Sequence, residues 1–152
     1  MRKLHLLKNN DIFIVMNVSA SIQEQAAAVL NLVGQPARIQ ILMVISSQEA
    51  CVCHIEAALG IRQASISQHL MILRKAGIVT THRVGRHIFY QVSRGEAMNL
   101  IQQAASMAGA DFHALEILSV RPIAGCSCPQ CNPGLGPNQA CRNHNLSTIT
   151  KG

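Results

Sequence analysis

The chain has no tryptophan, one tyrosine and three phenylalanines among its 152 residues. With so few aromatic side chains, the core must be built from alanine, leucine, isoleucine and valine, which favours packed helices over a large sheet. No apolar run approaches the length of a transmembrane span, so no membrane partner is expected. The length suits one compact domain and little more.

We do not expect residues 1–18 to act as a secretory leader. The apolar run at residues 12–16 is too short for the core of a signal peptide, and Asn9, Asn10 and Asp11 precede it. We therefore expect a cytoplasmic protein in which residues 1–18 form an N-terminal extension that need not be ordered. Met16 is an alternative translation start.

Acidic residues are absent between Glu56 and Glu96. The same span has six basic residues, equal to the whole formal net charge of +6, and three histidines. A basic surface this concentrated indicates an anionic partner, most simply double-stranded DNA, although a patch kept for solubility is the alternative. The basic residues are Arg62, Arg74, Lys75, Arg83, Arg86 and Arg94.

The apolar spacing of residues 19–119 predicts one mainly α-helical domain of five helices with a small β-hairpin. Ser19 or Ser21 can cap a first helix that ends at Val33, and Pro36 begins a second at residues 36–45. Helices at residues 51–59 and 63–76 then follow around Gly60, and Gly77 ends the last of these. The order is typical of a winged helix-turn-helix.

The helix at residues 63–76 is the candidate reading helix. Ile66, Leu70 and Leu73 recur at i, i+4 and i+7 and should face the core. Small and amide side chains on the other face can approach and hydrogen-bond base edges. Strands at residues 78–83 and 87–92 predict a wing whose basic tip contacts phosphates. The DNA-contacting candidates are Gln63, Ala64, Ser65, Ser67, Gln68, His69, Arg83 and Arg86.

A fifth helix is expected over residues 95–119. Its apolar positions are spaced alternately by three and four residues, which is a heptad seam and predicts a dimer interface. Two-fold pairing would let two reading helices cover half-sites about 10 bp apart. The seam comprises Met98, Ile101, Ala105, Ala108, Phe112 and Leu115.

Six cysteines in a cytoplasmic chain should be reduced, so they are candidate metal ligands or redox thiols. Cys51 and Cys53 open the third helix, and thiolates select soft ions such as As(III), Cd(II) and Pb(II). On a regular helix an i, i+2 pair diverges by about 200°, so the two need a loosened helix start or further ligands. One or both are otherwise small buried residues.

Residues 120–152 form a Pro-, Gly- and Asn-rich tail without a core of its own. The tail carries Cys126, Cys128, Cys131 and Cys141, with His144 as a further donor. Three arrangements are open. Cys51 and Cys53 share one ion with tail cysteines, which we favour. Alternatively the four tail cysteines bind Zn(II) independently, or both sites exist.

Together these motifs resemble the ArsR/SmtB family of metal-responsive winged-helix repressors. The resemblance runs from about residue 30 to residue 93. It rests on the Gly-Gln-Pro-Ala-Arg run from Gly34, the Ala-Cys-Val-Cys run from Ala50, the reading helix from Gln63 to Leu70, the Leu-Arg-Lys-Ala-Gly run from Leu73, and the Gly-Arg pair at Gly85. It implies a homodimer that represses an operator and leaves it when a metal or metalloid binds.

The chain departs from the family in three places. Glu56 stands where the arsenic-sensing type has another cysteine, and the cysteine tail lies outside the family's common core. Asp111 and His113 have the spacing of a zinc-sensing pair, but no further ligand follows at the helical repeat.

Two other functions compete with metal sensing. The same repressor could sense oxidants or reactive sulfur through a dithiol. A thiol enzyme or metallochaperone is disfavoured by the basic wing and by the lack of a nucleophile–base pair, so no enzyme activity is expected. The implied ligand is a thiolate-bound inducing ion, As(III), Cd(II), Pb(II) or Zn(II), with no organic cofactor.

Overall fold

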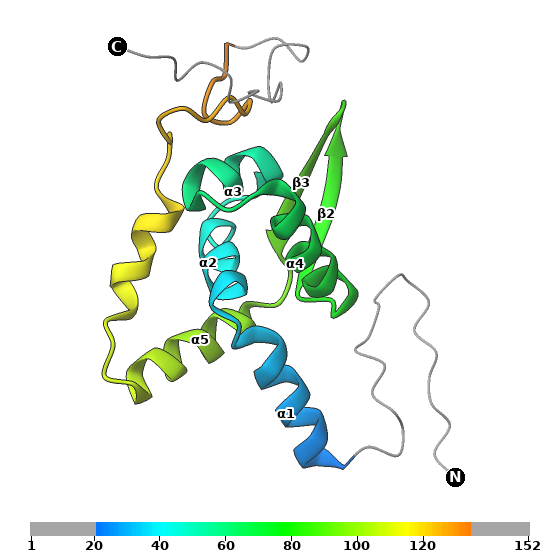
Figure 1. Cartoon of the computed structure of the whole chain (residues 1–152), viewed down its shortest axis with the longest axis vertical. Coiled ribbons are helices and arrows are strands. Elements are labelled where there is room, and N and C mark those ends of the chain that lie inside the picture. The colour runs from blue at the N-terminus through cyan, green and yellow to red at the C-terminus, as the bar shows by residue number, and fades with distance from the viewer. Residues whose placement is uncertain (1–20, 135–152) are drawn as a thin grey trace.

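The computed structural model describes residues 21–134 as five α-helices, one 3₁₀ helix and a three-stranded antiparallel sheet (Figure 1). This confirms the predicted winged helix-turn-helix, with six helices in the described part instead of five. The elements are α1 (Ile22–Val33), α2 (Pro36–Val44), β1 (Ala50–Cys51), α3 (Val52–Leu59), α4 (Gln63–Lys75), β2 (Val79–Val84), β3 (His87–Val92), α5 (Gly95–Met107) and the 3₁₀ helix η1 (Phe112–Ser119).

Helix α2 is the centre of the hydrophobic core. Its residues 41–44 are all buried, and α3, α4, α5 and η1 pack around it. Helix α4 contributes Ile66, Leu70 and Leu73, the three residues that its spacing predicted to face inward. Burying an aliphatic side chain of this size stabilises the fold by about 1.5–3 kcal/mol. The core therefore fixes the inner face of α4 and leaves its outer face to solvent.

Two glycines set the orientation of α4. Gly60 ends α3 with a left-handed φ of 66°, and its amide donates to the carbonyl of Glu56 at 2.8 Å. Gly77 follows α4 with φ 70°, and the next amide, that of Ile78, donates to the carbonyl of Leu73. Because both glycines adopt a backbone conformation that other residues rarely take, the turns around α4 are sharply defined.

The sheet has the order β1-β3-β2. Strands β2 and β3 form the predicted wing around a two-residue turn at Gly85 and Arg86. Strand β1 was not expected. Cys51 pairs with Phe89 of β3, so this cysteine is extended and precedes α3 instead of lying inside it.

Helix α1 extends from the rest of the domain as an arm (Figure 1), and of its residues only Val33 is buried. Ser21 caps it in a reciprocal capping box with Glu24. Two of its apolar side chains are exposed, with Ile22 83% and Leu30 54% accessible. Within residues 21–134, no single helix is long and apolar enough to cross a membrane; only α1 with α2 reaches that length, and the pair is bent by 69°.

The prediction of one continuous helix over residues 95–119 is wrong. Helix α5 ends at Met107, and Gly109 follows with a left-handed φ of 67°. The chain restarts as η1, where the Asp111 carboxylate accepts a hydrogen bond from the His113 amide. The apolar spacing continued through this break, but the glycine and the new N-cap divide the seam between two elements.

Candidate metal centre and DNA-reading surface

Three cysteine sulfurs surround one histidine nitrogen beside the start of α3. The Sγ atoms of Cys126, Cys128 and Cys131 lie 3.5, 3.6 and 3.3 Å from Nδ1 of His54. The four donor atoms all lie within 4.8 Å of one another. His54 and Cys128 are fully buried, and Cys126 is 6% exposed. We call these four residues the Cys3His cluster.

The donor set of the Cys3His cluster fits a tetrahedral ion. Zinc is bound by thiolate at about 2.3 Å and by imidazole at about 2.0 Å, which puts nitrogen and sulfur about 3.6 Å apart in a tetrahedral site. The three observed nitrogen–sulfur distances, 3.3 to 3.6 Å, are close to this value. Thiolate and imidazole are also the ligands that soft and borderline ions prefer. The cluster could therefore hold a metal ion.

Local hydrogen bonds shape the loop that carries the three thiols. We call residues 121–131 the thiol loop. The amide of Cys131 donates to the sulfur of Cys128 at 3.3 Å. The side-chain amide of Asn132 donates to the carbonyls of Cys126 and Cys128, at 2.6 and 3.3 Å. These bonds close tight turns that bring the sulfurs of a Cys-x-Cys-x-x-Cys segment to one side.

The thiols share negative charge unequally. Hydrogen bonds from the thiols of Cys126 and Cys51 lower the pKa of Cys128, whose thiolate they stabilise. The hydrogen bond to Cys128, followed by burial, raises the pKa of Cys126 and likewise that of Cys51. Cys128 therefore becomes a thiolate, the form that binds metals, before Cys51 and Cys126 do.

Cys51 and Cys53 lie against this cluster. Their Sγ atoms are 2.9 Å apart, and both pack in one group with Phe89 and the thiols of the loop. The divergence expected for an i, i+2 pair does not arise, because Cys51 is extended, with ψ 164°. The structure thus brings five of the predicted metal-ligand candidates together. Cys53 is disulfide-bonded, however, so the expectation that all six cysteines are reduced is wrong at this position. Cys141 and His144 lie outside the described residues.

Sequence reasoning missed His54. This histidine is the fourth member of the cluster, whereas Cys51 only hydrogen-bonds to Cys128 from beside it. A signal was present, because His54 follows the Cys-Val-Cys segment directly and imidazole is a common partner of thiolate in metal sites. The weaker zinc pair does not join the cluster: Asp111 caps η1, and His113 pairs with Glu116 at 3.0 Å on the surface.

The predicted reading helix presents part of its polar face. Ala64, Ser67 and Gln68 are exposed, whereas Ser65 and His69 are half-buried. Gln63 is also half-buried, and its amide donates to the carboxylate of Glu56 at 2.5 Å. At the wing, Arg83 and Arg86 are exposed around the turn.

The predicted dimer residues divide between the core and the surface. Ile101 is buried, and Met98 and Phe112 pack against the same core. Ala105 and Leu115 are half-buried, and Ala108 is exposed. Other apolar side chains face outward instead, with Met107 89% and Ile117 73% exposed.

A helix-turn-helix with an exposed polar face, followed by a basic wing, defines a DNA-binding regulatory protein. Residues 35–81 match the family described as bacterial regulatory protein, arsR family. The chain is 32% identical over 82 residues to the transcriptional repressor SmtB homolog of Synechocystis, covering 54% of this chain and 62% of that protein. It is 38% identical to the biofilm growth-associated repressor of Agrobacterium fabrum, covering 51% of this chain and 67% of that one.

Solved structures agree with this match. NolR from Sinorhizobium fredii superposes with a TM-score of 0.53 at 28% identity, over 60% of this chain and 97% of that one. The homodimeric winged helix-turn-helix domain of Mb0332 from Mycobacterium bovis gives a TM-score of 0.52 at 25% identity, over 61% and 86%. The chain belongs to the ArsR family of winged-helix transcriptional regulators, which are not enzymes.

Proposed function

We propose that this chain is a homodimeric DNA-binding repressor that leaves its operator when a thiophilic ion binds between α3 and the thiol loop. The single observation that carries the proposal is the convergence of Cys126, Cys128 and Cys131 on Nδ1 of His54. Four donors at tetrahedral spacing favour Zn(II) or Cd(II), whereas As(III) and Pb(II) can use three thiolates alone. Because repression requires access to chromosomal DNA, we infer a cytoplasmic location.

The position of His54 supports coupling to DNA. His54 lies in the first turn of α3. Helix α3 packs against α4, and the turn at Gly60 connects the two helices. Joining the thiol loop to His54 would fix the start of α3, and a shift of α3 would move α4 with it. Typical allosteric couplings of this kind are about 1–3 kcal/mol, or about 5- to 150-fold in affinity.

The dimer is supported by the exposed apolar residues of α1 and by the homodimeric Mb0332 domain. The arm-like α1 offers the exposed side chains of Ile22 and Leu30 to a partner, and Met107 of α5 and Ile117 of η1 are exposed apolar side chains as well. Apolar surface of this kind favours a second copy of the chain. The half-buried Ala105 and Leu115 and the exposed Ala108 from the predicted seam can still contribute at its edge.

The test is a DNA-binding titration of the reduced protein. The duplex is one enriched from a random-sequence library by the ion-free protein, and Zn(II), Cd(II), Pb(II) and As(III) are added separately under anaerobic reductant. At least one ion should lower the affinity by about fivefold or more. The proposal fails if none of the four changes the affinity.

A redox sensor of the same fold is the second candidate, supported by one observation. Cys53 is disulfide-bonded, and the sulfur of Cys51 lies 2.9 Å from it. In the reduced protein, an added two-electron oxidant would join the Cys51 and Cys53 sulfurs in a disulfide and take up the two thiol protons and two electrons. In the same titration with oxidant alone, loss of DNA binding without any response to ions would favour this candidate.

A further inference from the structure

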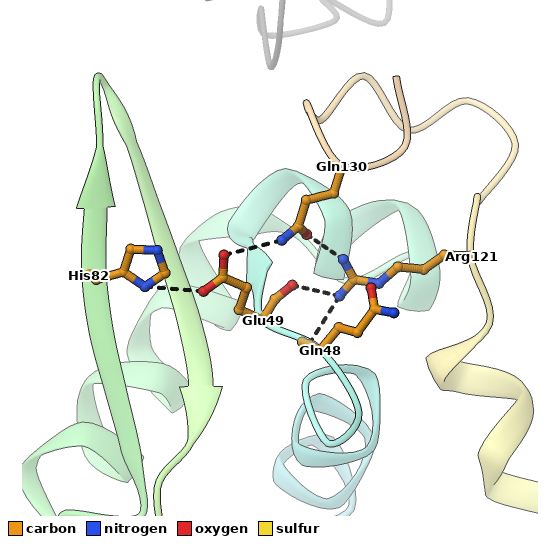
Figure 2. A network of polar contacts seen from close by, with 5 residues as sticks. All are labelled: Gln48, Glu49, His82, Arg121 and Gln130. Carbon is orange, nitrogen blue, oxygen red and sulfur yellow. Dashed lines mark hydrogen bonds and ion pairs between the residues drawn. The ribbon is translucent and has the colours of Figure 1, made fainter. Parts of the chain in front are cut away.

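A chain of polar contacts links the thiol loop to the wing (Figure 2). Arg121 donates from Nη2 to the backbone carbonyls of Gln48 and Glu49, at 3.1 and 2.7 Å. Its Nη1 donates to the side-chain oxygen of Gln130. The two ends of the thiol loop are thereby held together and fastened to the segment that precedes β1.

The Glu49 carboxylate is the junction of this network. One of its oxygens accepts a hydrogen bond from Nε2 of Gln130 at 3.4 Å, and the other lies 3.1 Å from Nδ1 of His82 on β2. Figure 2 shows the carboxylate between the wing strand on one side and Gln130 on the other. The Glu49 side chain is 29% exposed and that of His82 is 45% exposed, so solvent reaches the junction only in part.

The same place is reached by a second, apolar route. His82 is opposite Phe89 in the sheet register, and their rings stack with centroids 5.6 Å apart. Phe89 in turn packs with Cys126 and Cys128. A change in the conformation of the thiol loop would therefore reach His82 by two routes. One passes through Gln130 and Glu49, and the other passes through the Phe89 ring.

The charge of Glu49 gives this link a consequence for DNA. The sequence has no acidic residue from position 57 to position 95, so the wing strands bring none of their own. Glu49 places a carboxylate beside β2, where phosphate contacts are expected. A negative charge held there opposes the approach of DNA phosphates.

We propose that Arg121 and Gln130 are positioning residues that set the Glu49 carboxylate against His82, and that ion binding at the Cys3His cluster acts on the wing through this contact. This proposal rests on the proposed function, and it adds the residues through which ion binding at the cluster reaches the wing. Cys131 of the cluster is the neighbour of Gln130, so a thiol loop fastened to His54 keeps Gln130 on Glu49. The ion-loaded protein then holds both the carboxylate and the wing in the arrangement that binds DNA less well.

The experiment compares four full-length proteins: the wild type, Glu49→Gln, Gln130→Ala and Glu116→Gln. Gln130→Ala removes the contact without changing the charge of Glu49. Glu116→Gln is the matched control. It also neutralises a carboxylate that pairs with a histidine, His113 at 3.0 Å, but this pair lies on η1 and not at the wing. For each protein we measure bound Cd(II) per chain, the affinity for the enriched duplex with and without Cd(II), and deuterium uptake of residues 79–92.

All four proteins should bind the same amount of Cd(II). The ratio of DNA affinities without and with Cd(II) should fall by about fivefold or more in Glu49→Gln and Gln130→Ala, and stay at the wild-type value in Glu116→Gln. Cd(II) should also slow deuterium uptake of the wing in the wild type and the control only. Ratios and uptake that match the wild type in Glu49→Gln and Gln130→Ala would overturn the inference.

The same experiment distinguishes failure of the proposed function from failure of this proposal. If the proposed function is wrong, Cd(II) leaves the DNA affinity of the wild type unchanged. The deuterium uptake would still report whether the loop acts on the wing: a Cd(II) effect that depends on Glu49 supports the link even then, and a wild type without such an effect overturns it.

Discussion

Nδ1 of His54 lies 3.3 Å from Sγ of Cys131, although 77 positions separate the two residues in the chain. The contact joins the first turn of α3 to the thiol loop that follows η1. A buried imidazole has little freedom to move, so the loop sulfurs gather around a fixed point on the DNA-binding domain. The DNA-binding domain thus supplies the nitrogen and the tail supplies the sulfurs.

Replacing His54 should weaken ion binding. We expect His54→Ala to lower the affinity for Co(II) or Cd(II) by about tenfold or more, because one of four ligands is lost. Isothermal titration gives the affinity, and the visible absorption of the Co(II) complex reports the coordination. His113→Ala, at an exposed histidine outside the cluster, is the control and should bind like the wild type.

Because His54 is fully buried, its removal also leaves a cavity. His54→Cys distinguishes a lost ligand from a loosened fold, since it restores a donor. It should recover most of the affinity with the spectrum of a four-sulfur site. A His54→Ala protein that binds Co(II) with wild-type affinity and spectrum contradicts the ligand role.

Shortening the tail should abolish the response to ions and preserve DNA binding. Ending the chain after Gly125 removes Cys126, Cys128 and Cys131, while the core residues of α2 and α4 remain. Ending it after Gly134 is the matched control, because it removes Cys141 and leaves the thiol loop whole. Gel-shift titrations with Cd(II) should show release only for the longer protein, and a response in the shorter one would exclude the tail from the mechanism.

Local sequence signals predicted the DNA-binding fold well. Ile66, Leu70 and Leu73 have helical spacing and are buried, and Gly60 and Gly77 end helices where their conformational freedom is needed. Such features depend on neighbours within one or two turns, so the sequence alone is sufficient. The break at Gly109 was missed because the apolar spacing continues across it.

The candidate site could be predicted only in part, because it is made by long-range pairing. Soft-ligand chemistry identified the cysteines, but strand β1, which takes Cys51 out of the helix, depends on Phe89 far along the chain. The inward orientation of His54 likewise depends on where the thiol loop packs. No spacing rule within α3 distinguishes this histidine from one buried in a core.

Charging α1 should dissociate the proposed dimer. Ile22 is 83% exposed, so Ile22→Glu should leave the fold intact and produce monomers at micromolar concentration, measured by light scattering after gel filtration. Ile101→Ala is the contrasting variant. It removes a buried side chain and should lower the free energy of unfolding by about 2–5 kcal/mol without a specific effect on the oligomeric state. A fully dimeric Ile22→Glu protein would place the interface elsewhere.

Gln68 should read sequence. Its side chain is exposed on α4, and an amide can bond an adenine edge in the major groove. Gln68→Ala should weaken binding to the enriched duplex by about 1–3 kcal/mol and change binding to random DNA little. Fluorescence anisotropy with both duplexes measures the difference. Equal losses on the two duplexes would count against base reading.

Arg86 should act on the backbone of DNA, in contrast to Gln68. It is exposed in the turn of the wing beside Gly85, where a guanidinium can reach phosphates without meeting base edges. Arg86→Ala should therefore weaken enriched and random duplexes by a similar factor. Because one phosphate contact releases about one counterion, the slope of log affinity against log salt should become shallower by about 1. Titrations at several salt concentrations measure that slope, and an unchanged slope with a selective loss on the enriched duplex would make Arg86 a base reader instead.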